Sequence, residues 1–71
     1  MKLLKRAGNY EIYQTGNNPL DIEAFSVSPK AHGSAWIETL GGVSYINTDY
    51  LMGCPNYLYK ALRRYLPLKS S

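Results

Sequence analysis

The chain has 71 residues, of which 45% are hydrophobic and 13% aromatic, and its formal net charge at pH 7 is +3. This composition excludes an intrinsically disordered chain, and the length predicts a single small domain over residues 1–71. Cys54 is the only cysteine, which excludes an intrachain disulfide and favours a reducing, cytoplasmic location, and no apolar run is long enough for a transmembrane helix or the core of a signal peptide.

The N-terminal half of the chain predicts two strands separated by turn-forming residues. Residues 3–7 are expected to form a short helical turn or an ordered arm. The β-prone, aromatic run 10–14 predicts a first strand, and residues 22–28 predict a second. The segments 15–19 and 29–34 are rich in glycine, proline, asparagine and serine, which predicts loops.

The clearest local signal is a β-hairpin. Two β-prone runs, 35–40 and 43–47, flank Gly41-Gly42, and glycine supplies the positive φ angles that a two-residue hairpin turn requires. The resulting register pairs residues across the two strands: Leu40 with Val43, Glu38 with Tyr45, Ile37 with Ile46 and Trp36 with Asn47. Side chains alternate between the faces of a hairpin, so Trp36 and Tyr45 share one face, and Ile37 and Ile46 share the other.

An amphipathic helix is predicted over residues 55–66. Pro55 fits the first helical position, where its missing N–H costs nothing, and Pro67 ends the helix. The apolar residues of this segment lie on one stripe at helical spacing: Leu58, Ala61, Leu62, Tyr65 and Leu66. We therefore predict an α+β fold, in which a three- or four-stranded antiparallel sheet of hairpins carries this C-terminal helix on one face. The stripe packs either on Ile37 and Ile46 or on the opposite face of the hairpin.

Charge is unevenly distributed along the chain. Seven of the eight cations lie in two end segments: Lys2, Lys5 and Arg6, then Lys60, Arg63, Arg64 and Lys69. All five acids lie between these segments, with Lys30 as the only cation there, so the ends carry +7 and the middle carries −4. Basic segments of this kind are typical of contact with a polyanion or an acidic protein.

Nucleic-acid binding is the function that these patterns favour. The predicted site combines the basic ends with two helix tyrosines: Lys2, Lys5, Arg6, Tyr57, Tyr59, Lys60, Arg63 and Arg64. Arginine and lysine side chains contact phosphates, and tyrosines stack on unpaired bases. Trp36 and Tyr45 offer a further stacking surface if their sheet face is open. The macrodipole alone also favours cations in the last turn of a helix, so the charge pattern has a purely structural explanation as well.

Residues 47–66 resemble the helix-turn-helix of small DNA-binding proteins. In that arrangement Thr48 or Asp49 caps a one-turn helix ending at Met52, Gly53 supplies the turn, and the helix over residues 55–66 is the recognition helix. The chain departs from the motif in its very short first helix and in Asp49, which stands where a small apolar residue normally packs.

The alternative function is a protein-binding module. The chain contains seven tyrosines, and its two-faced hairpin carries a tryptophan; this composition is typical of a protein interface. The segregated charges would steer the protein towards an acidic partner. Small inhibitors and accessory proteins of phages and mobile elements, which dock on host protein complexes, have a similar build. The choice between DNA or RNA and a protein partner stays open in the sequence.

Catalytic chemistry has little support in the sequence. His32 is the only histidine and Cys54 the only thiol, and nothing in the sequence places them together as a base and a nucleophile. The two side chains cannot complete a zinc site without carboxylates. Cys54 stands at the start of the predicted helix, a position that lowers the pKa of a thiol. We therefore predict a protein without enzymatic activity, metal or cofactor.

Overall fold

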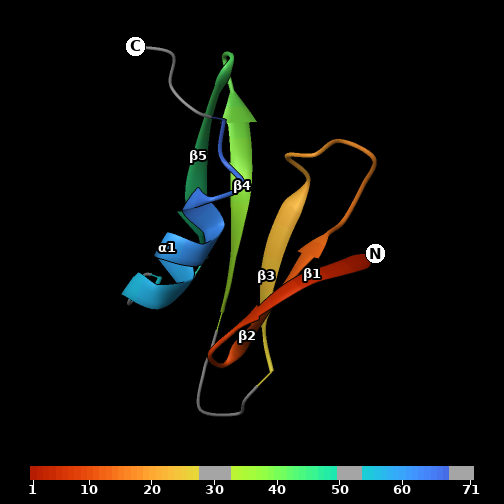
Figure 1. Cartoon of the computed structure of the whole chain (residues 1–71). Helices are drawn as coiled ribbons and strands as arrows, with labels where there is room; N and C mark the ends of the chain where they lie inside the picture. Colours follow the sequence, from red (N-terminus) through yellow and green to blue (C-terminus); the bar gives the residue numbers. More distant parts are fainter. Residues whose placement is uncertain (28–32, 50–53, 68–71) are drawn as a thin grey trace.

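The computed structural model describes residues 1–27, 33–49 and 54–67. These residues form a five-stranded antiparallel sheet with the strand order β1-β2-β3-β4-β5, followed by one helix, α1 (Figure 1). The bounds are β1 (Lys2–Ala7), β2 (Tyr10–Gln14), β3 (Ile22–Ser26), β4 (Ser34–Leu40), β5 (Val43–Thr48) and α1 (Asn56–Arg63). The predicted α+β class is confirmed, whereas the predicted number of strands, three or four, is too low.

The additional strand is β1, in the segment that we expected to form a helical turn or an arm. The chain reverses direction at Gly8, whose φ is +59°, and β1 then runs antiparallel to β2. The register shifts between Leu3 and Lys5, which leaves Leu4 as an extra residue that packs against the core. The hydrogen bonds of β1 come from a neighbouring strand, so the strand cannot be recognised from the local pattern of the segment.

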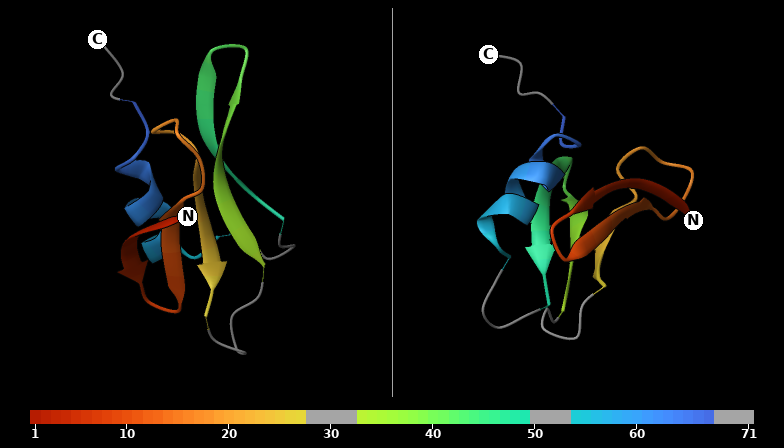
Figure 2. Two further views of the ribbon diagram at one scale, coloured as in Figure 1. Left: turned by 90° about the vertical axis from the view of Figure 1, so that its right-hand side faces the viewer. Right: turned by 60° about the horizontal axis from the view of Figure 1, so that its bottom comes forward.

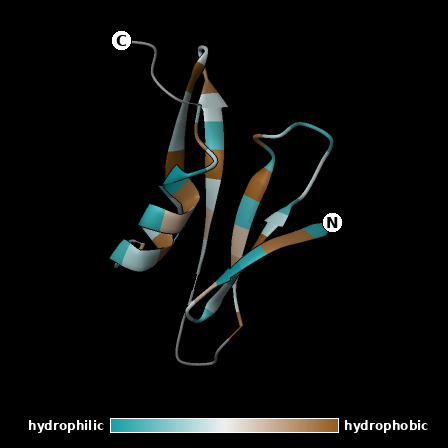
Figure 3. Cartoon of the chain, in the orientation of Figure 1, coloured by the Kyte–Doolittle hydropathy of each residue, from teal (hydrophilic) through white to brown (hydrophobic). Residues whose placement is uncertain are grey.

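The β4–β5 hairpin has the predicted register. Leu40 pairs with Val43, Glu38 with Tyr45, Ile37 with Ile46 and Trp36 with Asn47. Gly41 and Gly42 have φ angles of +60° and +79°, as the two-residue turn requires. Hydrophobic segments, in brown in Figure 3, are interrupted by hydrophilic ones, in teal, along the strands, and successive side chains point to opposite faces of the sheet.

The helix is shorter than predicted at both ends. Pro55 is the N-cap residue rather than the first residue of the helix, and α1 ends at Arg63 instead of residue 66. Residues 64–66 form a tighter turn, in which the backbone amide of Tyr65 donates to the carbonyl oxygen of Leu62 at 3.0 Å. Pro67 prevents the helix from continuing, because it has no N–H to donate to the carbonyl oxygen of Arg63, four residues earlier.

The helix covers one face of the sheet (Figure 2). The buried side chains between the two layers are Tyr10, Ile12, Ile22, Ala24, Ala35, Ile37, Leu58, Ala61 and Leu62. Ile46 and Tyr65 are partly buried and pack against this core. The helix therefore packs on the face of the hairpin that carries Ile37 and Ile46, the first of the two predicted arrangements, and Trp36 and Tyr45 lie on the opposite face.

Candidate functional site

The face of the sheet that α1 does not cover carries both aromatic and acidic side chains. Its residues alternate along the strands with the buried ones, and cross-strand pairing places Tyr13 next to Glu23, and Glu23 next to Trp36. We call this surface the acidic face, and it comprises Glu11, Tyr13, Glu23, Phe25, Trp36, Glu38 and Tyr45. The Tyr13 and Phe25 rings meet edge to face, with their centroids 5.8 Å apart.

Glu38 is the centre of a hydrogen-bond network on the acidic face. Its carboxylate accepts bonds from the Tyr45 hydroxyl at 2.7 Å, the Trp36 indole Nε1 at 3.1 Å and the Asn47 side-chain amide at 3.4 Å. The Tyr45 hydrogen bond, followed by those from Trp36 and Asn47, lowers the pKa of Glu38, and the same contact raises the pKa of Tyr45. Glu38 is thus a carboxylate at neutral pH, so the two predicted stacking residues adjoin a negative charge.

Arg6 also lies on the acidic face, away from the helix cations. Its Nε forms an ion pair with the Glu11 carboxylate at 3.0 Å, and Glu11 also accepts a hydrogen bond from the Tyr13 hydroxyl at 2.8 Å. That hydrogen bond is the main reason that the pKa of Tyr13 is raised. The predicted cluster of N-terminal and C-terminal cations is therefore divided, because Arg6 pairs with an acid on the other side of the sheet.

The remaining predicted cations of the described residues lie on the helix side of the sheet. Lys60 and Arg63 on α1 and Arg64, its C-cap residue, are exposed, and no described carboxylate forms an ion pair with any of them. Lys5 pairs with Ile12, whose buried side chain faces α1, and Lys2 pairs with Gln14, which lies on the same side as Ile12. We call these five residues the basic face: Lys2, Lys5, Lys60, Arg63 and Arg64.

The two helix tyrosines have different environments. Tyr57 lies against the β1–β2 turn, where its hydroxyl accepts the backbone amide of Asn9 at 3.4 Å and its ring centroid is 6.3 Å from that of Tyr10. Tyr59 lies on the side of α1 that faces β5, and the guanidinium carbon of Arg63 is 5.9 Å from its ring centroid. Tyr57 therefore attaches the helix to the sheet, whereas Tyr59 lies beside an open groove.

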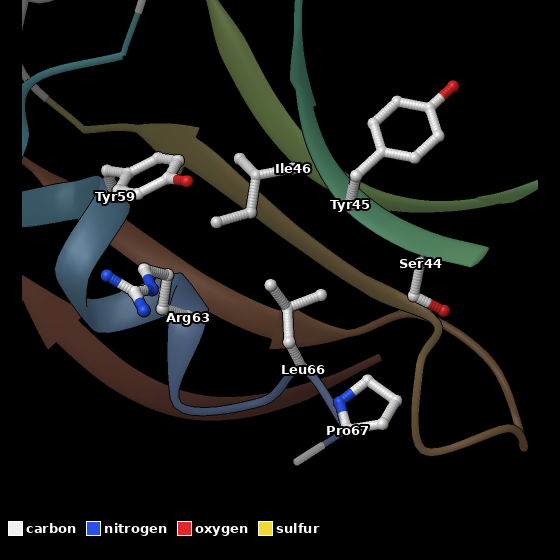
Figure 4. A pocket seen from close by; sticks show the side chains of 7 residues that line it. All are labelled: Ser44, Tyr45, Ile46, Tyr59, Arg63, Leu66 and Pro67. Carbon is white, nitrogen blue, oxygen red and sulfur yellow. The ribbon is translucent and has the colours of Figure 1, made fainter. Parts of the chain in front are cut away.

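The groove beside Tyr59 separates the C-terminal end of α1 from β5 and has a volume of about 640 Å³ (Figure 4). Its lining residues are Ser44, Tyr45, Ile46, Tyr59, Arg63, Leu66 and Pro67. Sequence analysis missed this groove, because it depends on how the helix packs across the sheet. The sequence contains one feature that relates to this groove: the segment 43–48, which forms one of its walls, has no charged residue.

The structure also bears on other residues that the sequence analysis singled out, most of them near the start of the helix. Burial raises the pKa of the Cys54 thiol, so the predicted lowering by the helix is wrong in direction. Thr48 is the last residue of β5, and Asp49 accepts hydrogen bonds from the amide and hydroxyl of Ser34, so both residues belong to the sheet end of this segment. The rest of the predicted short helix, up to Met52, lies outside the described residues, as does His32.

The described segments contain neither a cluster of metal-ligating side chains nor a helix long enough to span a membrane. No group of three or more histidine, cysteine or acidic side chains in residues 1–27, 33–49 and 54–67 is placed to hold a metal ion. The helix within those segments is too short and too polar to cross a bilayer.

Comparison with known proteins adds no family to this description. No protein family matches the chain, and neither a curated protein nor a solved structure matches it.

Proposed function

We propose that the protein binds nucleic acid through its basic face. The observation that supports this function is the separation of charge across the sheet: five cations lie on the helix side, and three glutamates lie on the opposite side with one paired arginine. Lysine and arginine side chains bind nucleic acid by neutralising phosphates, which releases counterions from the nucleic acid. A cation without a carboxylate partner in the protein has its charge available for this contact. Lys60, Arg63 and Arg64 meet this condition within the described residues.

The acidic face gives the interaction a direction. Glu11, Glu23 and Glu38 would repel a phosphate backbone, so the nucleic acid approaches the side of the sheet that carries α1. Trp36 and Tyr45 are not stacking residues in this proposal, since both donate hydrogen bonds to the Glu38 carboxylate. Tyr59 takes their place, because it is 44% exposed and stands beside Arg63.

Salt-dependent binding tests the proposal. Fluorescence anisotropy with mixed-sequence DNA and RNA oligonucleotides, measured from about 50 mM salt upwards, should give an affinity that falls steeply with salt concentration. Replacing Lys60, Arg63 and Arg64 by glutamine should weaken binding and flatten the log–log slope by about 0.9 per lost phosphate contact. The matched control is Arg6→Gln, which removes one positive charge from the acidic face and should leave the slope unchanged.

Two results would contradict nucleic-acid binding. One is the absence of binding at about 50 mM salt, where electrostatic affinity is high. The other is an equal loss of affinity in Arg6→Gln and in a single helix variant such as Arg64→Gln. That result would assign the effect to net charge rather than to the basic face.

A protein partner is the second candidate function, and a different observation favours it. Four aromatic side chains lie on the acidic face, which no described element covers, and Tyr45 is 37% exposed. Aromatic side chains supply most of the binding energy at protein interfaces. If this function holds, Trp36→Ala should abolish binding of a partner, whereas variants of α1 should mainly slow its association.

A further inference from the structure

The two edge strands of the sheet differ in how they are protected. The outer edge of the sheet at β1 carries three cations, Lys2, Lys5 and Arg6, and its register is broken at Leu4. Charges and bulges of this kind prevent an edge strand from pairing with another chain. The other edge, β5, has no charged residue and no proline, and its register with β4 is unbroken over six pairs. It therefore lacks every one of these protective features.

The pairing pattern shows which backbone groups of β5 face outward. In a two-residue hairpin the residues flanking the turn, Leu40 and Val43, exchange hydrogen bonds, and such pairs alternate along the two strands. Ser44 and Ile46 consequently direct their N–H and C=O groups away from β4. None of the described residues hydrogen-bonds these groups. Thr48 closes this stretch, because its amide donates to the Asn47 side-chain oxygen at 2.9 Å.

The groove lies directly beside this open edge. Ile46 points into the groove towards Arg63 and Leu66, and Ser44, on the same face of β5, lies at the end of the groove that is farther from Tyr59 (Figure 4). A strand added to β5 would place every second side chain in this groove, since strand side chains alternate between faces. An extended peptide would thus gain backbone hydrogen bonds from β5 and a partly apolar site for its side chains.

Charge decides which strand fits. The groove is lined by Arg63 and by no acid, and Arg63 has no carboxylate partner within the described residues. A second copy of this chain pairing through β5 would bring no carboxylate, because the strand VSYINT contains none, and it would add the cations of a second helix. We propose that the groove between β5 and α1 binds an extended acidic peptide, which adds to the sheet as a sixth strand and places a carboxylate against Arg63.

The proposal of this peptide site does not rest on the proposed nucleic-acid function, although the two surfaces share one residue. The peptide uses the backbone of Ser44 and Ile46, which takes no part in phosphate contact, and it does not require Lys60 or Arg64. Arg63 belongs to both surfaces. A bound peptide should therefore compete with an oligonucleotide for Arg63 if both functions hold, and it should bind equally well if the nucleic-acid proposal fails.

Selection from a random octapeptide library provides the probe. The full chain is immobilised, bound peptides are sequenced, and the consensus peptide is synthesised and titrated into isotope-labelled protein. We expect the consensus to alternate β-prone residues with at least one Asp or Glu. Its binding should shift the NMR signals of the Ser44 and Ile46 amides more than those of the acidic face.

Two matched pairs of variants test the geometry. Ser44→Pro removes the outward N–H and should weaken the consensus peptide by about tenfold or more, whereas Ser44→Ala keeps that N–H and should stay within about twofold. Arg63→Gln should weaken the acidic peptide by about tenfold and should not affect a peptide with Gln in place of its acid. Arg64→Gln, one residue along the helix, should leave peptide affinity within about twofold. Circular dichroism checks that each variant is folded.

Several results would overturn the peptide site. The library selection could yield no consensus peptide, or a consensus without an acidic residue. Ser44→Pro and Ser44→Ala could also bind the consensus peptide with equal affinity. Shifts of the β5 amides that depend on protein concentration alone would assign the edge to a second copy. Displacement of the peptide by an oligonucleotide that itself shifts the backbone amide signals of Ser44 and Ile46 would assign the groove to nucleic acid.

Discussion

Tyr57 lies so close to Gly8 that a Cβ atom at position 8 would overlap the tyrosine ring. This contact joins the first turn of α1 to the β1–β2 hairpin, 49 positions away along the chain. The Tyr57 hydroxyl supports it by accepting the backbone amide of the next residue, Asn9. The orientation of the helix, and with it the position of the basic face, therefore depends partly on the absence of a side chain at position 8.

Gly8→Ala should destabilise the protein by more than the backbone alone explains. Gly8 has a φ of +59°, where a Cβ costs about 1–2 kcal/mol, and the overlap with Tyr57 adds to this cost. Gly41→Ala is a matched control, because Gly41 has a φ of +60° and nothing within 4 Å of the added carbon. Urea denaturation should show the larger loss for Gly8→Ala, and equal losses would mean that the turn and Tyr57 do not pack as described.

Leu62→Ala should reduce the free energy of unfolding by about 2–4 kcal/mol, because it removes methyl groups from a tightly packed site. The Leu62 side chain is fully buried between the helix and the sheet, with 0% exposure. Leu40→Ala is the control, since Leu40 is 69% exposed and should change stability little. Thermal melting separates the two variants, and similar melting temperatures would argue against the described packing of α1.

Replacing Gly41 and Gly42 together by valine should disrupt the β4–β5 hairpin. Both residues have positive φ angles, which β-branched side chains resist, and no neighbouring atom lies near either position. The cost is therefore conformational rather than steric. The double replacement by asparagine, which tolerates positive φ, should be mild by comparison. Amide NMR signals of residues 35–47 provide the measurement, and unchanged signals in the valine variant would remove the hairpin turn from this description.

Glu38 should make stability depend on pH in the acid range. Its pKa is lower in the folded protein than the ordinary value of 4.5, owing first to the hydrogen bond from Tyr45 and then to those from Trp36 and Asn47. The stabilisation is therefore fully present above the unfolded-state pKa and is lost as pH falls through the folded-state pKa. Glu38→Gln should flatten this part of the stability curve.

Urea denaturation from neutral pH down to about pH 3 would measure the effect. Glu23→Gln is the control, because Glu23 lies on the same acidic face but forms no side-chain hydrogen bond with the described residues. If both variants flatten the pH dependence of stability in the acid range to the same extent, the dependence comes from the overall charge of the acidic face and not from the Glu38 hydrogen bonds.

Local sequence signals determined the elements whose stabilising contacts are near in sequence. The hairpin register follows from two glycines between β-prone runs, and all four predicted pairs are present. The strand over residues 10–14 has its predicted bounds. The helix was predicted from apolar spacing, and it ends at Arg63 rather than residue 66, where Pro67 offers no N–H to the Arg63 carbonyl oxygen.

Tertiary structure decided what depends on partners distant in the chain. Segment 2–7 is a strand because β2 supplies its hydrogen bonds, which no property of the segment itself indicates. The same pairing turns Arg6 towards Glu11, so the basic residues that looked like one cluster in the sequence lie on opposite faces. Likewise, Trp36 and Tyr45 lie on the face that α1 leaves uncovered, because α1 packs on the Ile37 side of the sheet. The groove forms where the C-terminal end of that helix lies beside β5. Local propensity specifies elements, but the charge and shape of a surface arise only when strand pairing and helix packing bring distant residues together.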